Sequence, residues 1–193
     1  MKKLYILIAA LPLTCSCALT HQEITLKPEV NVAAADTGKG RAVQLKTADE
    51  RTSGVIGSRG LKGGQVPSAE ITSTQDVLTV LQTALLEGLQ RKGYKPSPEE
   101  GVVQNGLRVE LRNLEYGVTP GIITGTLRAE VALKAICIVK STPSYERMYR
   151  GEEKDSVFFV QFASDNEKYI NSALAKAIEN LLDDSKLQAC LSG

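Results

Sequence analysis

The chain has 193 residues, 23 Lys and Arg against 22 Asp and Glu, no Trp and three Phe. Its near-neutral charge argues against a nucleic-acid-binding protein, which needs a basic face. It also gives no reason to expect an acidic lipid surface as a partner. The scarcity of aromatic residues argues against an aromatic ligand cage, and the length fits one ordinary domain.

The first sixteen residues are organised like a bacterial signal peptide. Lys2 and Lys3 form a basic start, and an uncharged apolar stretch of about ten residues follows, from Leu4 to Leu13. That stretch is too short to span a bilayer, which needs roughly 20 residues, but it suits a cleaved signal peptide. We therefore expect residues 1–16 to be removed.

The end of this segment resembles a lipobox, in which a cysteine after the cleavage site is lipidated and becomes the N-terminus. We predict lipidation of Cys17, because Ser16 supplies the small residue needed before it. Cys15 is a second candidate, and ordinary signal cleavage or an N-terminal transmembrane anchor is a further alternative. By resemblance to sorted lipoproteins, Ala18 in place of Asp implies the outer membrane, with the domain facing the periplasm.

Removal of residues 1–16 leaves 177 of the 193 residues and takes two lysines away, so 21 basic residues stand against 22 acidic ones. Residues 17–40 have no aromatic residue and little periodicity, and we expect them to form the lipidated N-terminus and a flexible tether of roughly 25 Å. A single periplasmic domain is expected at 41–193.

The domain is expected to begin with a strand at 42–52, in which Val43 and Leu45 alternate with polar residues. The Gly-rich stretch 53–64 lacks the G-x-x-x-x-G-K-[ST] spacing of a phosphate-binding loop, so a loop or irregular hairpin is expected there. A short return strand at 69–72 follows.

The stretch 73–92 predicts an amphipathic helix, because apolar residues recur at helical spacing. Ser73 or Thr74 is expected to cap its start, and Gly93 its end. Three more strands are expected at 107–112, 122–139 and 145–162.

Alternation continues in the last of these strands, where Tyr145, Arg147 and Tyr149 share one face, and a bulge is expected near Gly151. A second helix follows, opened by a capping box of Ser164 and Glu167. The order of elements predicts an α+β domain, with a mostly antiparallel sheet of about five strands and two helices packed on one face.

Two short motifs resemble those of the YajG-type family of bacterial lipoproteins. ADERT at 48–52 resembles an A-D-x-R-T motif that ends the family's first strand, and RKGY at 91–94 resembles its R-x-G-Y motif. The order of elements also fits over nearly the whole mature chain. The resemblance implies an envelope lipoprotein without an assigned activity.

Asp49 and Arg51 match the first motif residue by residue. Residues two apart on a strand share a face, so the pair is expected either to form a salt bridge that anchors the following loop, or to contact a ligand or partner.

The mature chain retains Cys137 and Cys190. An oxidising periplasm allows a disulfide between them, provided that the chain after the last helix returns to the strand of Cys137. Two separate buried thiols are the default interpretation. Without further Cys or His nearby, the two cysteines are no metal site, and His21 in the expected tether is a poor ligand or base. No metal and no cofactor are expected.

These features predict a non-catalytic binding or scaffold module that contacts an envelope protein or the cell wall. The alternative is an accessory protein that handles lipid or glycolipid, which requires an apolar groove, for example between helices and sheet. An enzyme is not expected. No G-x-S-x-G motif is present, and the acidic run of Glu152, Glu153 and Asp155 is typical of a solvated hairpin.

Overall fold

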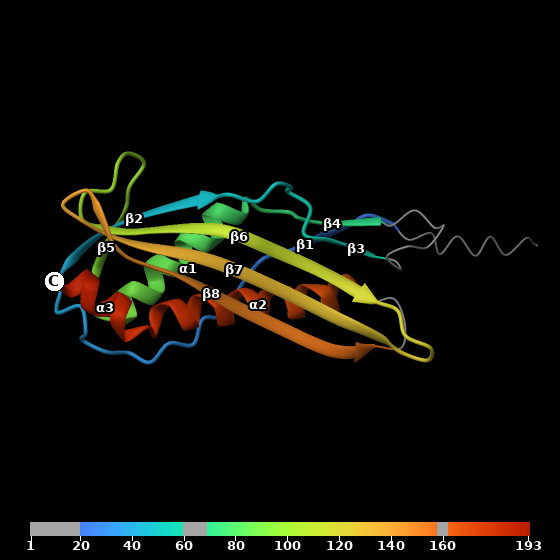
Figure 1. The fold of residues 1–193 in the computed structure, drawn as a ribbon. Helices are drawn as coiled ribbons and strands as arrows, with labels where there is room; N and C mark the ends of the chain where they lie inside the picture. Colours follow the sequence, from blue (N-terminus) through green and yellow to red (C-terminus); the bar gives the residue numbers. More distant parts are fainter. Residues whose placement is uncertain (1–19, 60–68, 158–161) are drawn as a thin grey trace, which may run out of the picture.

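The computed structural model describes residues 20–59, 69–157 and 162–193. Within these ranges, Figure 1 shows a long twisted sheet with helices along one side. The signal peptide expected at 1–16, the lipidation candidates Cys15 and Cys17, and the later part of the Gly-rich stretch 53–64 lie outside the described residues.

The described residues form one eight-stranded sheet. Its strands are β1 (Gln22–Ile24), β2 (Ala42–Asp49), β3 (Gly57–Arg59), β4 (Ala69–Ser73), β5 (Lys95–Pro98), β6 (Gly106–Thr119), β7 (Gly125–Val139) and β8 (Thr142–Val157). The long strands β6, β7 and β8 pair antiparallel, as do β3 and β4. β2 runs parallel to β5 and β6, β1 to β4, and β3 to β6.

The sheet is therefore mixed, and the prediction of a mostly antiparallel sheet of about five strands with two helices is wrong. The three strands β1, β3 and β5 have only three or four residues each, too few to show a period of two. β5 reads Lys-Pro-Ser-Pro, which suits only a sheet edge. Strands that pair in parallel also lie far apart in the chain, because a parallel connection needs a long crossover. The order of elements along the sequence therefore does not reveal these pairings.

Helix α1 (Val77–Arg91) lies within the stretch predicted to be helical. Its cap is Asp76 rather than Ser73 or Thr74: the Asp76 carboxylate accepts a hydrogen bond from the backbone N–H of Thr79 at 2.8 Å. An acidic cap also interacts favourably with the helix dipole. The hydrogen bonds from Thr79 lower the pKa of Asp76.

Helix α2 (Ala163–Leu182) begins after Phe162, which provides no side-chain cap, so the predicted capping box at Ser164 is not formed. Glu167 instead accepts a hydrogen bond from the backbone N–H of Thr25. A third helix, α3 (Ser185–Ser192), was not predicted. Its eight residues are too few for a clear 3.6-residue period.

The prediction of a bulge near Gly151 is also wrong, since Gly151 pairs in regular register with Val131. The register shifts lie elsewhere, between Leu111 and Asn113 in β6 and after Cys137 in β7. Gly151 instead permits close packing: a Cβ at this position would lie 1.9 Å from the carbonyl oxygen of Ala173 on α2.

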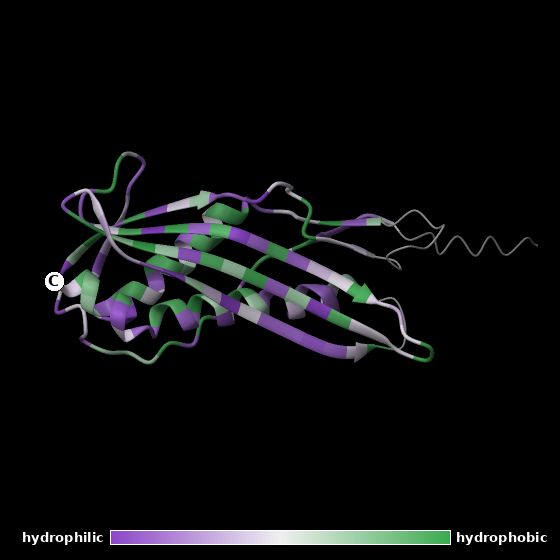
Figure 2. Ribbon diagram, in the orientation of Figure 1, coloured by the Kyte–Doolittle hydropathy of each residue, from purple (hydrophilic) through white to green (hydrophobic). Residues whose placement is uncertain are grey.

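The apolar faces of the sheet and of all three helices meet in one core. Figure 2 shows the alternation of hydrophobic and hydrophilic residues along β6 and β7 that produces this face. The fully buried residues include Leu45, Leu107 and Leu133 from the sheet and Leu85 and Ile170 from the helices. A core of this size contributes most of the stability of such a domain.

Residues 20–40 pack on the domain, which corrects the expectation of a flexible tether for this part of 17–40. Ile24, Leu26 and Val32 are buried in the core. Backbone N–H groups along the segment donate to side chains of α2, at Glu167, Asn171 and Glu179. The segment thus lies along α2 and becomes part of the folded domain.

Candidate functional site

The sheet branches where β2 and β3 share the same edge of β6. β2 stays paired with β6 as far as Asp49 opposite Leu111, and β3 joins β6 further along, with Gly57 opposite Tyr116. Between these two contacts residues 50–56 leave the sheet and return to it. We call this region the fork. The register shift of β6 lies at the same place, and such bulges redirect side chains at the edge of a sheet.

Asp49 and Arg51 form a closely coupled pair at the fork. The Arg51 Nε and Nη2 groups donate to the two carboxylate oxygens of Asp49 at 2.9 and 2.7 Å, and the Arg51 backbone N–H donates at 3.1 Å. The hydrogen bonds from Arg51 hold the pKa of Asp49 below its ordinary value. This bidentate geometry is stronger and more specific than a simple surface ion pair. The predicted salt bridge is therefore present.

The Arg51 side chain is only 8% exposed, and its Nη1 group is buried without a hydrogen-bond partner among the described residues. A buried donor left unpaired costs about 1–3 kcal/mol. Arg51 also lines a hollow of about 450 Å³ at the fork, together with polar residues that include Glu50, Glu70 and Arg112. The fork thus places a rigidly held guanidinium beside an open, polar space.

The outer face of β6, β7 and β8 is different, because several of its charges are paired within the chain. Arg128 bridges to Glu130 at 3.0 Å and to Glu152 at 2.9 Å, and Lys134 bridges to Glu146 at 2.9 Å. Hydrophilic bands on these strands are visible in Figure 2. Opposite charges on neighbouring strands stabilise a sheet modestly, and this face carries no excess of either sign that would select a charged partner.

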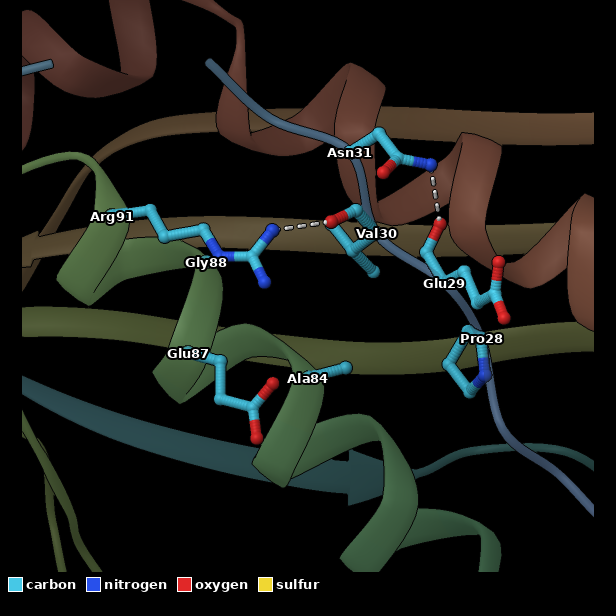
Figure 3. A pocket seen from close by; sticks show the side chains of 8 residues that line it. All are labelled: Pro28, Glu29, Val30, Asn31, Ala84, Glu87, Gly88 and Arg91. Carbon is cyan, nitrogen blue, oxygen red and sulfur yellow. Dashed lines mark hydrogen bonds between the residues drawn. The ribbon is translucent and has the colours of Figure 1, made fainter. Parts of the chain in front are cut away.

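A second hollow, of about 260 Å³, lies where the N-terminal segment crosses α1 (Figure 3). Arg91 reaches across and donates to the carbonyl oxygen of Val30 at 2.8 Å. The carboxylates of Glu29 and Glu87 also border it. Because the Arg91 guanidinium already fastens the N-terminal segment to α1, this hollow belongs to the packing between these two segments and is not a ligand site.

Asp184 forms a third polar cluster, at the start of α3. Its carboxylate accepts hydrogen bonds from Tyr145 at 2.8 Å, Tyr149 at 2.6 Å and Arg147 at 3.2 Å, and it caps α3 through the N–H of Lys186. Burial by itself raises the pKa of Asp184, but these hydrogen bonds lower it overall to about 2. The alternation in the sequence placed the three β8 residues on one face, whereas Asp184 gave no signal.

A disulfide joins Cys137 on β7 to Cys190 on α3, with the two Cα atoms 6.4 Å apart. The default interpretation of two separate thiols therefore does not describe the structure. α3 turns the chain back onto the sheet after α2, which is the return that the bond requires. The disulfide and the Asp184 cluster together fix α3 to β7 and β8.

The acidic run on β8 is engaged in structural contacts. Glu153 forms an ion pair with Lys176 at 2.8 Å and accepts a hydrogen bond from Ser172, and Asp155 accepts one from Tyr169. Burial raises the pKa of Glu153, but the contacts with Lys176 and Ser172 lower it overall. These are not the raised pKa values of a general acid.

Among the described residues, no group of three or more His, Cys, Asp or Glu side chains is arranged to hold a metal ion. Nor do the described helices include one that is long and apolar enough to cross a membrane. His21 lies beside the Thr72 hydroxyl at 3.0 Å.

The space between the helices and the sheet is closely packed in the described part of the chain. Besides the contact of Gly151 with α2, a Cβ on Gly88 of α1 would lie 2.2 Å from the Leu182 side chain of α2. Leu81, Leu85 and Leu174 are fully buried there. This packing argues against the apolar groove that lipid handling requires.

The sequence defines the class of protein through the family whose profile it matches. The chain belongs to the Lipoprotein_16 family of uncharacterized lipoproteins, whose sequence profile matches residues 28–192. Proteins of this class are held at a membrane of the bacterial envelope by an attached lipid. No match is found among curated proteins.

Solved structures resemble this chain at low sequence identity. Protein XCC0632 from Xanthomonas campestris is 12% identical, with a TM-score of 0.61 over 87% of this chain and 96% of that chain. A neuraminyllactose-binding hemagglutinin homolog from Helicobacter pylori is 10% identical, with a TM-score of 0.49 over 86% and 97% of the two chains. A minor lipoprotein from Acinetobacter baumannii is also 10% identical, with a TM-score of 0.41 over 79% and 90%. The likeness to XCC0632 concerns the fold alone.

Proposed function

We propose that the protein is a YajG-type lipoprotein of the outer membrane, facing the periplasm, that acts as a non-catalytic binding or scaffold module. Its partner is another envelope protein or the cell wall. Membership of a lipoprotein family supports the lipid anchor, and the lipobox-like sequence favours Cys17 as its site. Ala18 after that cysteine favours the outer membrane.

The observation that carries the binding role is the fork. A guanidinium fixed in place by a bidentate carboxylate loses little side-chain entropy when it meets a partner. The hollow beside Arg51 is also bordered by the exposed side chains of Glu50, Glu70 and Arg112, which are complementary to polar or charged groups of a partner chain. The polar lining of the hollow suits a polar partner segment rather than an acyl chain.

Labelling of cells with radioactive palmitate tests the anchor. Incorporation is expected to persist in a Cys15→Ser variant and to disappear in a Cys17→Ser variant. The reverse pattern would contradict the assignment of Cys17. Fractionation of the labelled protein then distinguishes the outer from the inner membrane.

Site-specific photocrosslinking in the envelope tests the fork. A photoreactive amino acid at Thr52, an exposed residue that lines the hollow, is expected to give a discrete adduct with one partner. The same amino acid at Ser144, an exposed residue near the start of β8, is the control and should give none. Arg51→Lys keeps the charge but loses the bidentate pair, and should weaken the adduct. Equal adducts from both positions, or an adduct indifferent to Arg51→Lys, would refute a role for the fork.

A further inference from the structure

The register of the sheet fixes the direction from which the N-terminal segment enters the domain. Gln22 of β1 lies opposite Ile71 of β4, Ile71 lies opposite Gly57 of β3, and Gly57 lies opposite Tyr116 of β6. Gln22 and Tyr116 therefore stand in one row across the sheet. Because β1 is parallel to β4, β4 antiparallel to β3, and β3 parallel to β6, β1 runs opposite to β6. The chain that precedes β1 thus leads toward the end at which β6 turns into β7.

Figure 1 shows the same arrangement, with the blue start of the described chain and the yellow β6–β7 turn at one end of the molecule. Thr20 is two residues before Gln22, level with Val118 of β6. Cys17 lies three residues earlier, at most about 10 Å of extended chain. β1 and β6 are three strand spacings apart in the sheet order, or about 14 Å. A lipid on Cys17 is therefore tethered close to the level of the β6–β7 turn.

The β6–β7 turn is unusually apolar for an exposed loop. Ile122 is fully exposed and Ile123 is 80% exposed. The sequence from 117 to 127, Gly-Val-Thr-Pro-Gly-Ile-Ile-Thr-Gly-Thr-Leu, contains no charged residue. Phe162, just before the first turn of α2, is 75% exposed. That turn of α2 is linked to β1 by a hydrogen bond from Asn166 to Gln22 at 2.6 Å, so Phe162 belongs to the same end.

We infer that the β6–β7 turn is a second membrane contact, which inserts Ile122 and Ile123 into the surface of the bilayer that holds the lipid anchor. The inference rests on the proposed lipidation of Cys17. Isolated exposed apolar residues are ordinary. Here, however, two adjacent ones occupy an uncharged turn. This turn lies at the end of the domain that the lipid anchor holds close to the bilayer. Insertion orients the domain with the β7–β8 turn and α3 away from the membrane.

The packing of residues 20–40 is essential to this orientation. A flexible tether would let the domain stand away from the membrane and rotate freely. Thr20 is the first described residue, and only Ala18 and Leu19 stand between it and Cys17, the proposed site of the lipid. The domain is thus held against the bilayer by its β6–β7 end.

Tryptophan fluorescence tests the contact, because the natural chain contains no Trp. The full lipidated protein, carrying Ile122→Trp or Ile123→Trp, is reconstituted into vesicles of phosphatidylethanolamine and phosphatidylglycerol, with and without brominated acyl chains. The emission is expected to shift to shorter wavelength in vesicles and to be quenched by the bromine. Thr142→Trp, in the turn at the opposite end of the sheet, is the control and should show neither effect.

Flotation of the vesicles separates the two ways in which the idea can fail. If the protein does not float with the vesicles, the lipid anchor is refuted and the inference with it. If the protein floats but the Ile122→Trp and Ile123→Trp variants behave like the Thr142→Trp control, the anchor stands and the second contact is refuted. Quenching confined to the two turn variants of the floating protein supports the contact.

Discussion

Replacement of Asp184 by Asn tests how the C-terminal helix is held. Asn is as good a helix cap as Asp, and with one acceptor oxygen and one NH2 donor it imitates the protonated acid, so Asp184→Asn removes the charge together with one of the two acceptor oxygens. The cluster lowers the pKa of Asp184 from 3.8 to about 2, and each unit of pKa is worth about 1.36 kcal/mol. The Asp184 side chain is only 5% exposed, so solvent screens this interaction little. The free energy of unfolding at pH 7 should fall by about 2 kcal/mol in the variant.

The pH dependence follows from the sign of this pKa change. Because the folded pKa is depressed, the carboxylate stabilises the native state above its ordinary pKa of 3.8, and this contribution is lost as the pH falls toward about 2. The difference in stability between wild type and Asp184→Asn should therefore be full at pH 7, mostly lost near pH 2 and absent below it.

Urea unfolding of both proteins at the two pH values, with the disulfide intact, measures this difference. Glu146→Gln is a matched control, because Glu146 forms an exposed ion pair with Lys134, and such pairs are worth at most about 1 kcal/mol. The reasoning would be refuted by equal stability of Asp184→Asn and wild type at pH 7, or by a difference that persists undiminished near pH 2.

Two further predictions concern the attachment of the helices. Reduction of the Cys137–Cys190 disulfide, whose cysteines are 53 residues apart, should lower stability by about 4 kcal/mol in the loop-entropy treatment; a urea midpoint unchanged by reductant would contradict this. Gly151→Ala should destabilise by at least about 1–3 kcal/mol, because its methyl group meets the Ala173 carbonyl on α2. Gly117→Ala, where nothing lies within 4 Å of the new Cβ, is the control, and equal thermal stability of the two variants would show that the β8–α2 contact can adjust.

The sequence predicted separate parts of the candidate site but not how they come together. The spacing of Asp49 and Arg51 indicated a pair on one face, and the structure contains that pair. The fork that gives the pair its setting depends on β3, a three-residue strand that pairs with β6 more than fifty residues away. Similarly, alternation placed Tyr149 and its neighbours in one row, but their common partner Asp184 lies on a connection between two helices.

The sequence by itself determined the long elements, because fifteen or more residues of regular alternation or helical spacing leave few other ways to bury an apolar face. It also determined the two family-like motifs and indicated where a lipid is attached. Only the tertiary structure decided how the short strands pair, and that residues 20–40 belong to the folded domain. Their contacts join residues up to about 150 positions apart, such as Asn31 and Glu179, and no local pattern encodes such distant partners. The local sequence of residues 20–40 does not distinguish a flexible tether from a packed segment. The segment packs because α2 presents a surface to it.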